Sequence, residues 1–185
     1  MKQALIIIDV QNDYFPEGKF PLINTESALT NTLHLQHDFR IKKLPIFYIQ
    51  HFKQGSNADF FVKDSVGAEL HPKLLPISEE NELIIQKSYP NSFYQTDLHQ
   101  KLQQYSVKQL VICGMMSHMC VDSTTRCANE LGYQPILIHD ACTNRDLEFN
   151  DEIIPAKKVH YSFMSALAGF ANVINCHEFI QKKID

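Results

Sequence analysis

The sequence predicts an α/β fold: a three-layer αβα, Rossmann-like domain with a mostly parallel sheet of about six strands. Short apolar runs of strand length alternate with longer helical patterns, as is typical of parallel strands joined by crossover helices. The first run, residues 4–9, is almost continuously apolar, as expected for a strand buried on both faces. With 185 residues the chain has the length of one domain, so we expect residues 1–185 to form a single unit.

Each expected element follows from its local pattern. Strands are predicted at 4–9, 45–50, 83–86, 109–113, 134–139 and 171–174. Helices are predicted at 26–43, 97–105, 118–131 and 155–170, with a short helix at the C-terminal end. Gly132 suits the position after a helix, and Pro155 suits a first helical turn. Residues 52–81 show no clear period, and loops of this length are usually lids, interfaces or disordered segments.

Composition excludes several classes of function. Hydrophobic residues make up 44% of the chain and charged residues 21%, an ordinary globular balance that excludes a disordered chain or a fibrous repeat. The net charge of −4 argues against a nucleic-acid or anionic-membrane surface, both of which need clustered Lys and Arg. The longest apolar runs, such as 5–8, are far shorter than the roughly 20 residues of a membrane span. Asp9 interrupts the first apolar run too early for a secretion signal, so we expect a cytoplasmic protein.

The five cysteines are predicted to be free thiols, because their number is odd and no secretion signal precedes them. They form no Cys-x-x-Cys pair, so their spacing does not match a structural zinc site. The first strand leads into residues 9–13 rather than into a glycine-rich phosphate loop, which leaves a dinucleotide site without support. We therefore predict no cofactor.

The candidate site is predicted at the carboxyl ends of the strands, where open parallel sheets bind their ligands. This rule selects Asp9, Gln50 or His51, Lys87, the turn at 114–120, and Asp140. A thiol at Cys120, near the start of a helix and beside a lysine, is expected to have a lowered pKa, and a carboxylate nearby could take its proton. Each group also has a structural alternative, as a turn cap, a solvated lysine or a buried inert thiol.

The chain resembles the isochorismatase-like family of cysteine hydrolases along nearly its whole length. The stretches that carry the resemblance are 8–13, 85–87 with Phe93 and 96–98 after it, 111–126 running into Ala128 and 132–133, 140–141, and 159–168. The resemblance implies that Asp9 is a general base, Lys87 its charge partner and Cys120 a nucleophile that forms a thioester-type intermediate. It also implies a cis peptide at Met115–Met116 and an oxyanion hole made by the backbone amides of Met116 and Cys120.

The sequence departs from the metal-bearing nicotinamide branch of this family. That branch has an Asp-x-His pair after its second strand, where this chain has Gln50 and His51, and His71 is the only histidine between there and Lys87. His34 and His37 lie three residues apart on a predicted helix and are interpreted as surface or partly packed residues. We predict no metal.

Secondary site positions are predicted with alternatives left open. Gln11 either orients Asp9 or caps the turn, and Phe15 and Phe93 either line an apolar pocket or belong to the core. His118 either faces the substrate from the first turn of its helix or has no role in the site. Asp122 and Arg126, spaced i and i+4, predict an intrahelical ion pair.

Three functions are compatible with these residues. The first is a hydrolase that cleaves a C–N bond of a small carboxamide, ureido acid or aryl amide through Cys120. The second is a vinyl-ether hydrolase of the isochorismatase type, which protonates its substrate from the aspartate and does not need the cysteine. The third is a binding or scaffold protein that keeps the fold without turnover. The family resemblance further implies a homo-oligomer, a dimer or a tetramer, with residues 52–81 as an interface or lid.

Overall fold

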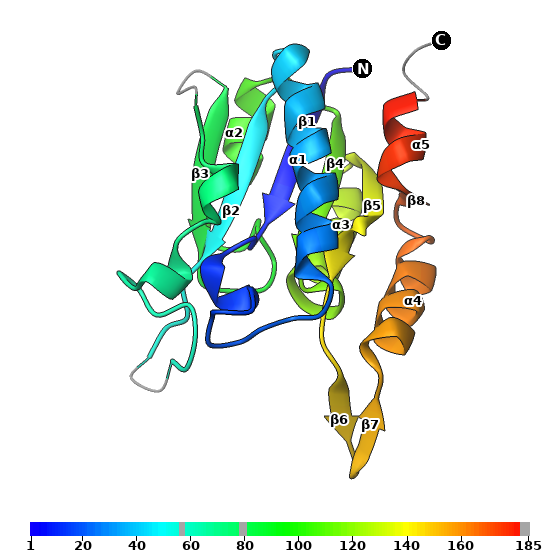
Figure 1. Ribbon diagram of the computed structural model, residues 1–185. Coiled ribbons are helices and arrows are strands. Elements are labelled where there is room, and N and C mark those ends of the chain that lie inside the picture. Colours follow the sequence, from blue (N-terminus) through cyan, green and yellow to red (C-terminus); the bar gives the residue numbers. More distant parts are fainter. Residues whose placement is uncertain (56–57, 78–80, 182–185) are drawn as a thin grey trace.

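Six parallel strands form the central sheet of the protein, and the predicted α/β fold is confirmed (Figure 1). The computed structural model describes residues 1–55, 58–77 and 81–181. The strand order is β3-β2-β1-β4-β5-β8. The strands are β1 (Gln3–Ile8), β2 (Ile46–His51), β3 (Glu82–Lys87), β4 (Gln109–Met115), β5 (Gln134–Thr143) and β8 (Asn172–Ile174).

The strand order puts the site next to the middle of the sheet. β1 lies between β2 and β4, and Leu5 is opposite both Ile46 and Val111. Residues 4–8 are therefore buried on both faces, which explains why this segment is continuously apolar. The order reverses beside β1, and such a switch point is where open α/β sheets form a ligand crevice.

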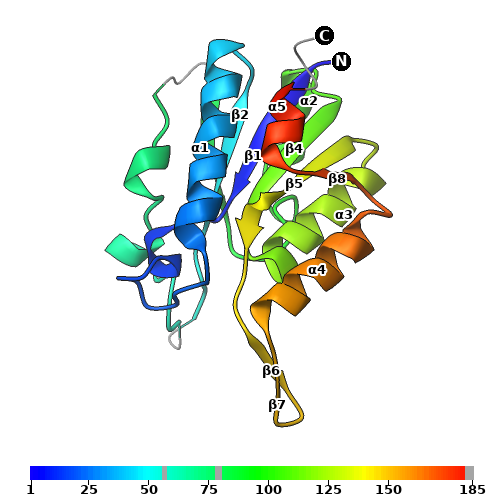
Figure 2. The same ribbon diagram turned by 45° about the vertical axis from the view of Figure 1, so that its right-hand side comes forward.

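Helices cover both faces of the sheet, as Figures 1 and 2 show. One face carries α1 (Thr25–Ile41) and α5 (Cys176–Gln181), whose Phe39 and Phe179 rings stack. The other face carries α2 (Leu98–Gln104), α3 (Asp122–Glu130) and α4 (Ala156–Leu167). Two predicted helices are shorter than expected: a wide π-type turn at Ser117–Val121 precedes α3, and α4 ends three residues before Phe170.

β5 continues to Thr143 and leads into a hairpin that the sequence did not predict. The hairpin consists of β6 (Leu147–Phe149) and β7 (Glu152–Ile154), which pair antiparallel and project beyond the sheet (Figures 1 and 2). Because β5 is longer than expected, Asp140 lies inside the strand and not at its end, which corrects its selection as a site candidate. Its carboxylate instead accepts a hydrogen bond from the Cys176 backbone N–H at 2.8 Å.

The predicted homo-oligomer stays a prediction.

The predicted 52–81 stretch is largely ordered by packing rather than by regular structure. Its described part holds two 3₁₀ turns, Val66–Ala68 and Pro72–Leu74, while residues 56–57 and 78–80 lie outside the described residues. Another 3₁₀ turn, Asn12–Tyr14, follows β1. The buried carboxylate of Asp13 joins the two regions, because it accepts hydrogen bonds from the backbone N–H groups of Lys19 and Phe61.

Within the described residues, no helix has the length and apolar character needed to cross a membrane.

Candidate active site

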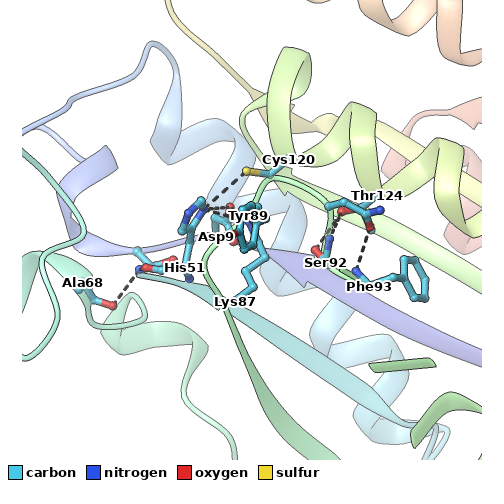
Figure 3. Close-up of polar contacts among 11 residues, drawn as sticks. Asp9, His51, Ala68, Lys87, Tyr89, Ser92, Phe93, Cys120 and Thr124 are labelled. Carbon is cyan, nitrogen blue, oxygen red and sulfur yellow. Dashed lines mark hydrogen bonds and ion pairs between the residues drawn. The ribbon is translucent and has the colours of Figure 1, made fainter. Parts of the chain in front are cut away.

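Three neighbouring strands deliver polar side chains to one point at the carboxyl edge of the sheet (Figure 3). Asp9 follows the last residue of β1, while His51 and Lys87 end β2 and β3 and are directly opposite each other in register. The backbone N–H of Asp9 donates to Ile49 at 3.1 Å, which holds the start of the turn against β2. The three strand ends therefore fix the relative positions of the three side chains.

The ammonium group of Lys87 is the centre of this cluster. Its Nζ lies 2.8 Å from Asp9 Oδ2, 3.0 Å from His51 Nδ1 and 3.1 Å from the carbonyl oxygen of Tyr89. An ammonium has three donors and no acceptor, so the Asp9 and Tyr89 oxygens accept hydrogen bonds from it. The His51 contact is a hydrogen bond from Lys87 in the tautomer that carries the ring proton on Nε2.

The Asp9–Lys87 pair keeps both partners charged in a buried place. Both side chains are completely buried. Burial alone would raise the pKa of Asp9, but the Lys87 ammonium and His51 outweigh it and hold that pKa below its usual value. Burial likewise lowers the pKa of Lys87, but the Asp9 carboxylate outweighs it and raises that pKa. Asp9 is thus an ionised carboxylate at neutral pH, and its Oδ1 has no hydrogen-bond partner among the described residues.

Cys120 reaches this cluster from the turn between β4 and α3. Its Sγ lies 3.8 Å from His51 Nδ1, and the Asp9, His51 and Cys120 polar atoms all lie within 4.8 Å of one another. The Met115–Met116 peptide that precedes the turn is cis, as the resemblance implies. Gly114 lets β4 approach β1 here, because an added Cβ would lie 2.1 Å from the carbonyl oxygen of Ile8.

The expected lowering of the Cys120 pKa is wrong. Burial and the negative charge of Asp9 raise the pKa of the thiol well above its usual value, against the opposing effect of Lys87. The helix that was expected to help begins only at Asp122, after the π-type turn. The resting pair is therefore a neutral thiol beside a carboxylate.

His51 is a site member that the sequence indicated only as one of two alternatives at the end of β2. Gln11 fixes its backbone, donating to the carbonyl oxygens of His51 and Ala68 at 2.9 and 2.8 Å. The side-chain oxygen of Gln11, Oε1, also accepts a hydrogen bond from the backbone N–H of His51 at 2.7 Å. Gln11 thus positions His51 and the 66–68 turn. In the alignment of β2 with β3, His51 is directly opposite Lys87. This register, which the sequence alone does not give, is the signal that favours His51 over Gln50.

The other predicted pocket residues each contact a further ring. The Phe15 ring packs 4.5 Å from that of His71, and the Phe93 ring stacks on Tyr133 and is turned away from Cys120 in Figure 3. His118 makes an edge contact with Phe163, and burial lowers its pKa. The structure brings Asp9, Lys87 and Cys120 together, and the pocket roles of the three rings stay predictions.

An aromatic cluster covers the site from the 12–20 and 58–77 segments. Tyr14 packs against Phe20, Phe60 and Phe61, and Phe61 also contacts the His51 ring. Burial and the negative charge of Asp9 raise the pKa of Tyr14 well above its usual value, so its hydroxyl stays neutral. Beside this cover, a cavity of about 430 Å³ has Lys87 and Tyr89 in its wall.

The family model of the isochorismatase domain matches residues 3–162. The chain belongs to the isochorismatase family, whose members are hydrolases. It is 47% identical over 182 residues to the uncharacterized isochorismatase family protein YddQ of Bacillus subtilis, covering 98% of this chain and 100% of that protein. It is 30% identical over 145 residues to streptothricin hydrolase of Streptomyces noursei, covering 78% of this chain and 51% of that protein.

A solved structure of the isochorismatase family has the same fold. The putative isochorismatase hydrolase from Oleispira antarctica superposes with a TM-score of 0.91 and is 42% identical. The match covers 97% of this chain and 96% of that one.

In this isochorismatase-family chain, Asp9, His51 and Cys120 are the described residues whose ligand atoms lie close enough to share a metal ion. Lys87 already supplies a cation between two of these ligands, at 2.8 Å from Asp9 and 3.0 Å from His51. A divalent ion at the same place would meet the ammonium at short range, which is electrostatically unfavourable. The donor set therefore suits an internal ammonium better than a metal. His34 and His37, also considered from sequence, are exposed on α1.

Proposed function

We propose that this protein hydrolyses a C–N bond of a small amide-like substrate through Cys120, with Asp9 and Lys87 completing a catalytic triad. One observation carries the proposal: a thiol, an ionised carboxylate and an ammonium converge in one buried cluster. This set can attack a carbonyl carbon and move the protons that such an attack requires.

The first half-reaction forms a thioester. As Cys120 Sγ attacks the carbonyl carbon, its proton passes to Asp9, because the raised thiol pKa leaves the proton on sulfur until attack begins. The backbone N–H groups of Met116 and Cys120 are the proposed donors to the oxyanion. Asp9 then returns the proton to the leaving nitrogen, and the C–N bond breaks to release an amine or ammonia.

The second half-reaction regenerates the thiol. A water molecule gives its proton to Asp9 and attacks the thioester carbon, and the C–S bond breaks to release the carboxylic acid. The proton on Asp9 returns to Sγ. Lys87 stays charged throughout, because the carboxylate beside it raises its pKa, and it holds Asp9 in place.

The charge state of Asp9 favours this reading over vinyl-ether hydrolysis. A vinyl-ether hydrolase needs a protonated aspartate to donate to carbon, whereas Lys87 holds the pKa of Asp9 below its usual value. Cys120 would also have no task in that reaction. The name of streptothricin hydrolase, 30% identical to this chain, likewise fits a hydrolase of a small organic molecule.

The experiment is a turnover screen combined with trapping of the intermediate. A panel of carboxamides, ureido acids and aryl amides is assayed for amine or ammonia release, and acid-quenched protein is analysed by intact mass for an acyl adduct. We expect an adduct on Cys120 and a loss of at least about 10³-fold in kcat for Cys120→Ala. Cys127→Ala is the matched control, because Cys127 lies two helical turns away on α3 and outside the cluster.

The outcomes separate the three hypotheses. If Asp9→Asn abolishes activity while Cys120→Ala keeps it, an aspartate-acid reaction replaces this proposal, and vinyl ethers become the substrates to test. If no substrate reacts and no reagent labels Cys120, the scaffold interpretation is favoured instead.

A further inference from the structure

A second cavity lies at the end of β5, between the beginnings of α1 and α4. Its volume is about 420 Å³, and its walls come from all three elements. None of Asp9, His51, Lys87 and Cys120 lines it. Figures 1 and 2 show that α1 and α4 both begin at the edge of the sheet where β5 ends. The cavity is thus separate from the cluster around Cys120.

Asn144 has an unsatisfied donor and belongs to the wall of this cavity. It lines the cavity and is 1% exposed, yet its Nδ2 has no hydrogen-bond partner among the described residues. Its own backbone oxygen accepts from the Ile23 N–H at 3.0 Å, which fixes the start of α1 against it. Buried amide donors are normally satisfied, so an unpaired one in a cavity wall favours an acceptor bound there.

The beginning of α1 supplies further donors to the same place. Asn24, Ser27 and Ala28 line the cavity, and the Asn24 side chain makes no capping hydrogen bond. The first N–H groups of a helix have no partner inside it and carry the positive end of the helix dipole. α1 is 17 residues long, so this dipole is fully developed. A helix start left without a side-chain cap is suited to an anion.

A lysine in the wall of the cavity agrees with an anionic ligand. Lys157 lines the cavity, and its Nζ lies 5.7 Å from the centre of the Tyr161 ring, another wall residue. Among the described lining residues Asp140 is the one carboxylate, and the Cys176 N–H already binds it at 2.8 Å.

We propose that this cavity is a second ligand site, which binds a small organic oxyanion, a carboxylate or a phosphate. The anionic group lies between Asn144 Nδ2, the start of α1 and Lys157, and an apolar body packs against Ile23 and Ala156. The volume exceeds that of an inorganic anion, which is why the ligand needs a body as well as a charged group. The site shares no residue with the proposed triad, so it stands independently of the proposed amide hydrolysis.

The test is calorimetric titration of the full chain with inorganic phosphate and, separately, with benzoate. We expect at least one of them to bind with a Kd of about 1 mM or tighter, and Lys157→Gln to weaken it by about five-fold or more. Lys158→Gln is the matched control, because Lys158 is the next exposed lysine on α4 and does not line the cavity. Binding of phosphate alone assigns a phosphate site, and binding of benzoate alone assigns a carboxylate site.

A second readout locates the ligand at Asn144. In ¹H–¹⁵N spectra the side-chain amide resonance of Asn144 should shift on titration with the anion that binds. Asn144→Asp, which adds a negative charge, should weaken binding by about ten-fold or more. The proposal is overturned if neither anion binds below about 10 mM, or if the two lysine variants weaken binding equally. The lysine pair keeps the test valid even if Asn144→Asp does not fold.

Discussion

β3 carries an ionic residue at each end, and the two ends differ in how completely that residue is satisfied. At its start, both oxygens of Glu82 bind Arg40 at 2.9 Å, and one of them also accepts from Tyr48 and from the Ile77 N–H. At its end, Lys87 binds Asp9 Oδ2, but Asp9 Oδ1 is buried without a partner among the described residues. One buried carboxylate is saturated with donors, and the other keeps an open acceptor.

This difference separates a structural ion pair from a reactive one. Glu82 joins α1 to β2 and β3 through Arg40 and Tyr48, and each of its two oxygens already accepts a hydrogen bond. Asp9 lies within 4.8 Å of a thiol, and its Oδ1 has no hydrogen-bond partner among the described residues. An unpaired buried acceptor is expected where a group must receive a proton.

The largest expected effect is a difference in turnover between two variants, one that removes the charge of Asp9 and one that removes the charge of Glu82. Asp9→Asn should lower kcat by at least about 10³-fold on any amide that the wild-type protein hydrolyses, because it removes the carboxylate that is proposed to take the Cys120 proton. Glu82→Gln should change kcat by less than about three-fold, since Glu82 lies at the other end of the strand. Steady-state kinetics of the two variants measures the contrast.

Circular dichroism of both variants is the control, because either change can also destabilise the protein. Equal losses of activity in two folded variants would contradict the distinction between the two ends of β3.

The second effect is on stability, and both changes are expected to lower it. Glu82→Gln removes a charge from a network of four hydrogen bonds and should lower the free energy of unfolding by about 2 kcal/mol. Asp9→Asn should lower it by about 3–5 kcal/mol, because it leaves the completely buried Lys87 ammonium without its counter-charge. Urea unfolding at pH 7 compares them, and a smaller loss for Asp9→Asn would contradict the charged state of the Asp9–Lys87 pair.

Lowering the pH tests the hydrogen-bond network of Glu82, because the direction of the change in stability follows from the pKa of Glu82. Burial raises the pKa of Glu82, but the hydrogen bonds from Arg40 and Tyr48 outweigh it, and the pKa lies below its usual value. The folded state therefore binds the proton more weakly than the unfolded state, so the stabilisation is present above the usual pKa of 4.5 and is lost as the pH falls through the folded value. The stability gap between wild type and Glu82→Gln should narrow below about pH 4.

The two ends of β3 also show what the sequence could and could not predict. Asp9, Lys87 and Cys120 were selected by the rule that ligands bind at strand ends, because periodicity locates those ends within a residue or two. His51 could not be separated from Gln50 without the strand register, and the Arg40–Glu82 network could not be predicted because its partners lie 42 residues apart.

The errors have physical reasons of the same kind. The Cys120 pKa was misjudged because sequence locates a thiol near a helix but not its burial or its distance to a carboxylate. The β6–β7 hairpin was missed because its three-residue strands are exposed and carry too short a pattern. For Phe93 the sequence leaves a pocket wall and a core position open, because it does not show that the ring packs on Tyr133.

A third and smaller effect concerns the reactivity of the Cys120 thiol. The charge of Asp9 helps to raise the thiol pKa, and the charge of Lys87 helps to lower it. Asp9→Asn should therefore speed iodoacetamide labelling of Cys120 at pH 7 by about ten-fold, while Lys87→Gln should slow it. In the wild type, the labelling rate should rise through pH 9 without a plateau.

Peptide mass spectrometry resolves the rate at each cysteine, and Cys127 on α3 serves as the internal control. A plateau of Cys120 labelling below pH 7 in the wild type would contradict the raised pKa. Such a plateau would instead support the lowered pKa of Cys120 that the sequence predicts.

The smallest expected loss of stability is that of an ion pair in which neither partner is fully buried. Comparing it with the two pairs of β3 tests whether burial sets the strength of an ion pair in this protein. Arg126 Nε lies 3.0 Å from Asp122 Oδ1 on α3, as the i, i+4 spacing predicted, with the side chains 33% and 17% exposed. Asp122→Asn should cost only about 0.3–0.5 kcal/mol, plus a small contribution from the helix dipole, because water screens this pair. Arg126 keeps its contact with the Phe170 ring in this variant. Urea unfolding at low salt and in 1 M NaCl measures the effect, which should disappear at high salt. A salt-independent loss as large as that of Glu82→Gln would mean that hydrogen-bond geometry, and not burial, sets the strength of the pairs in this protein.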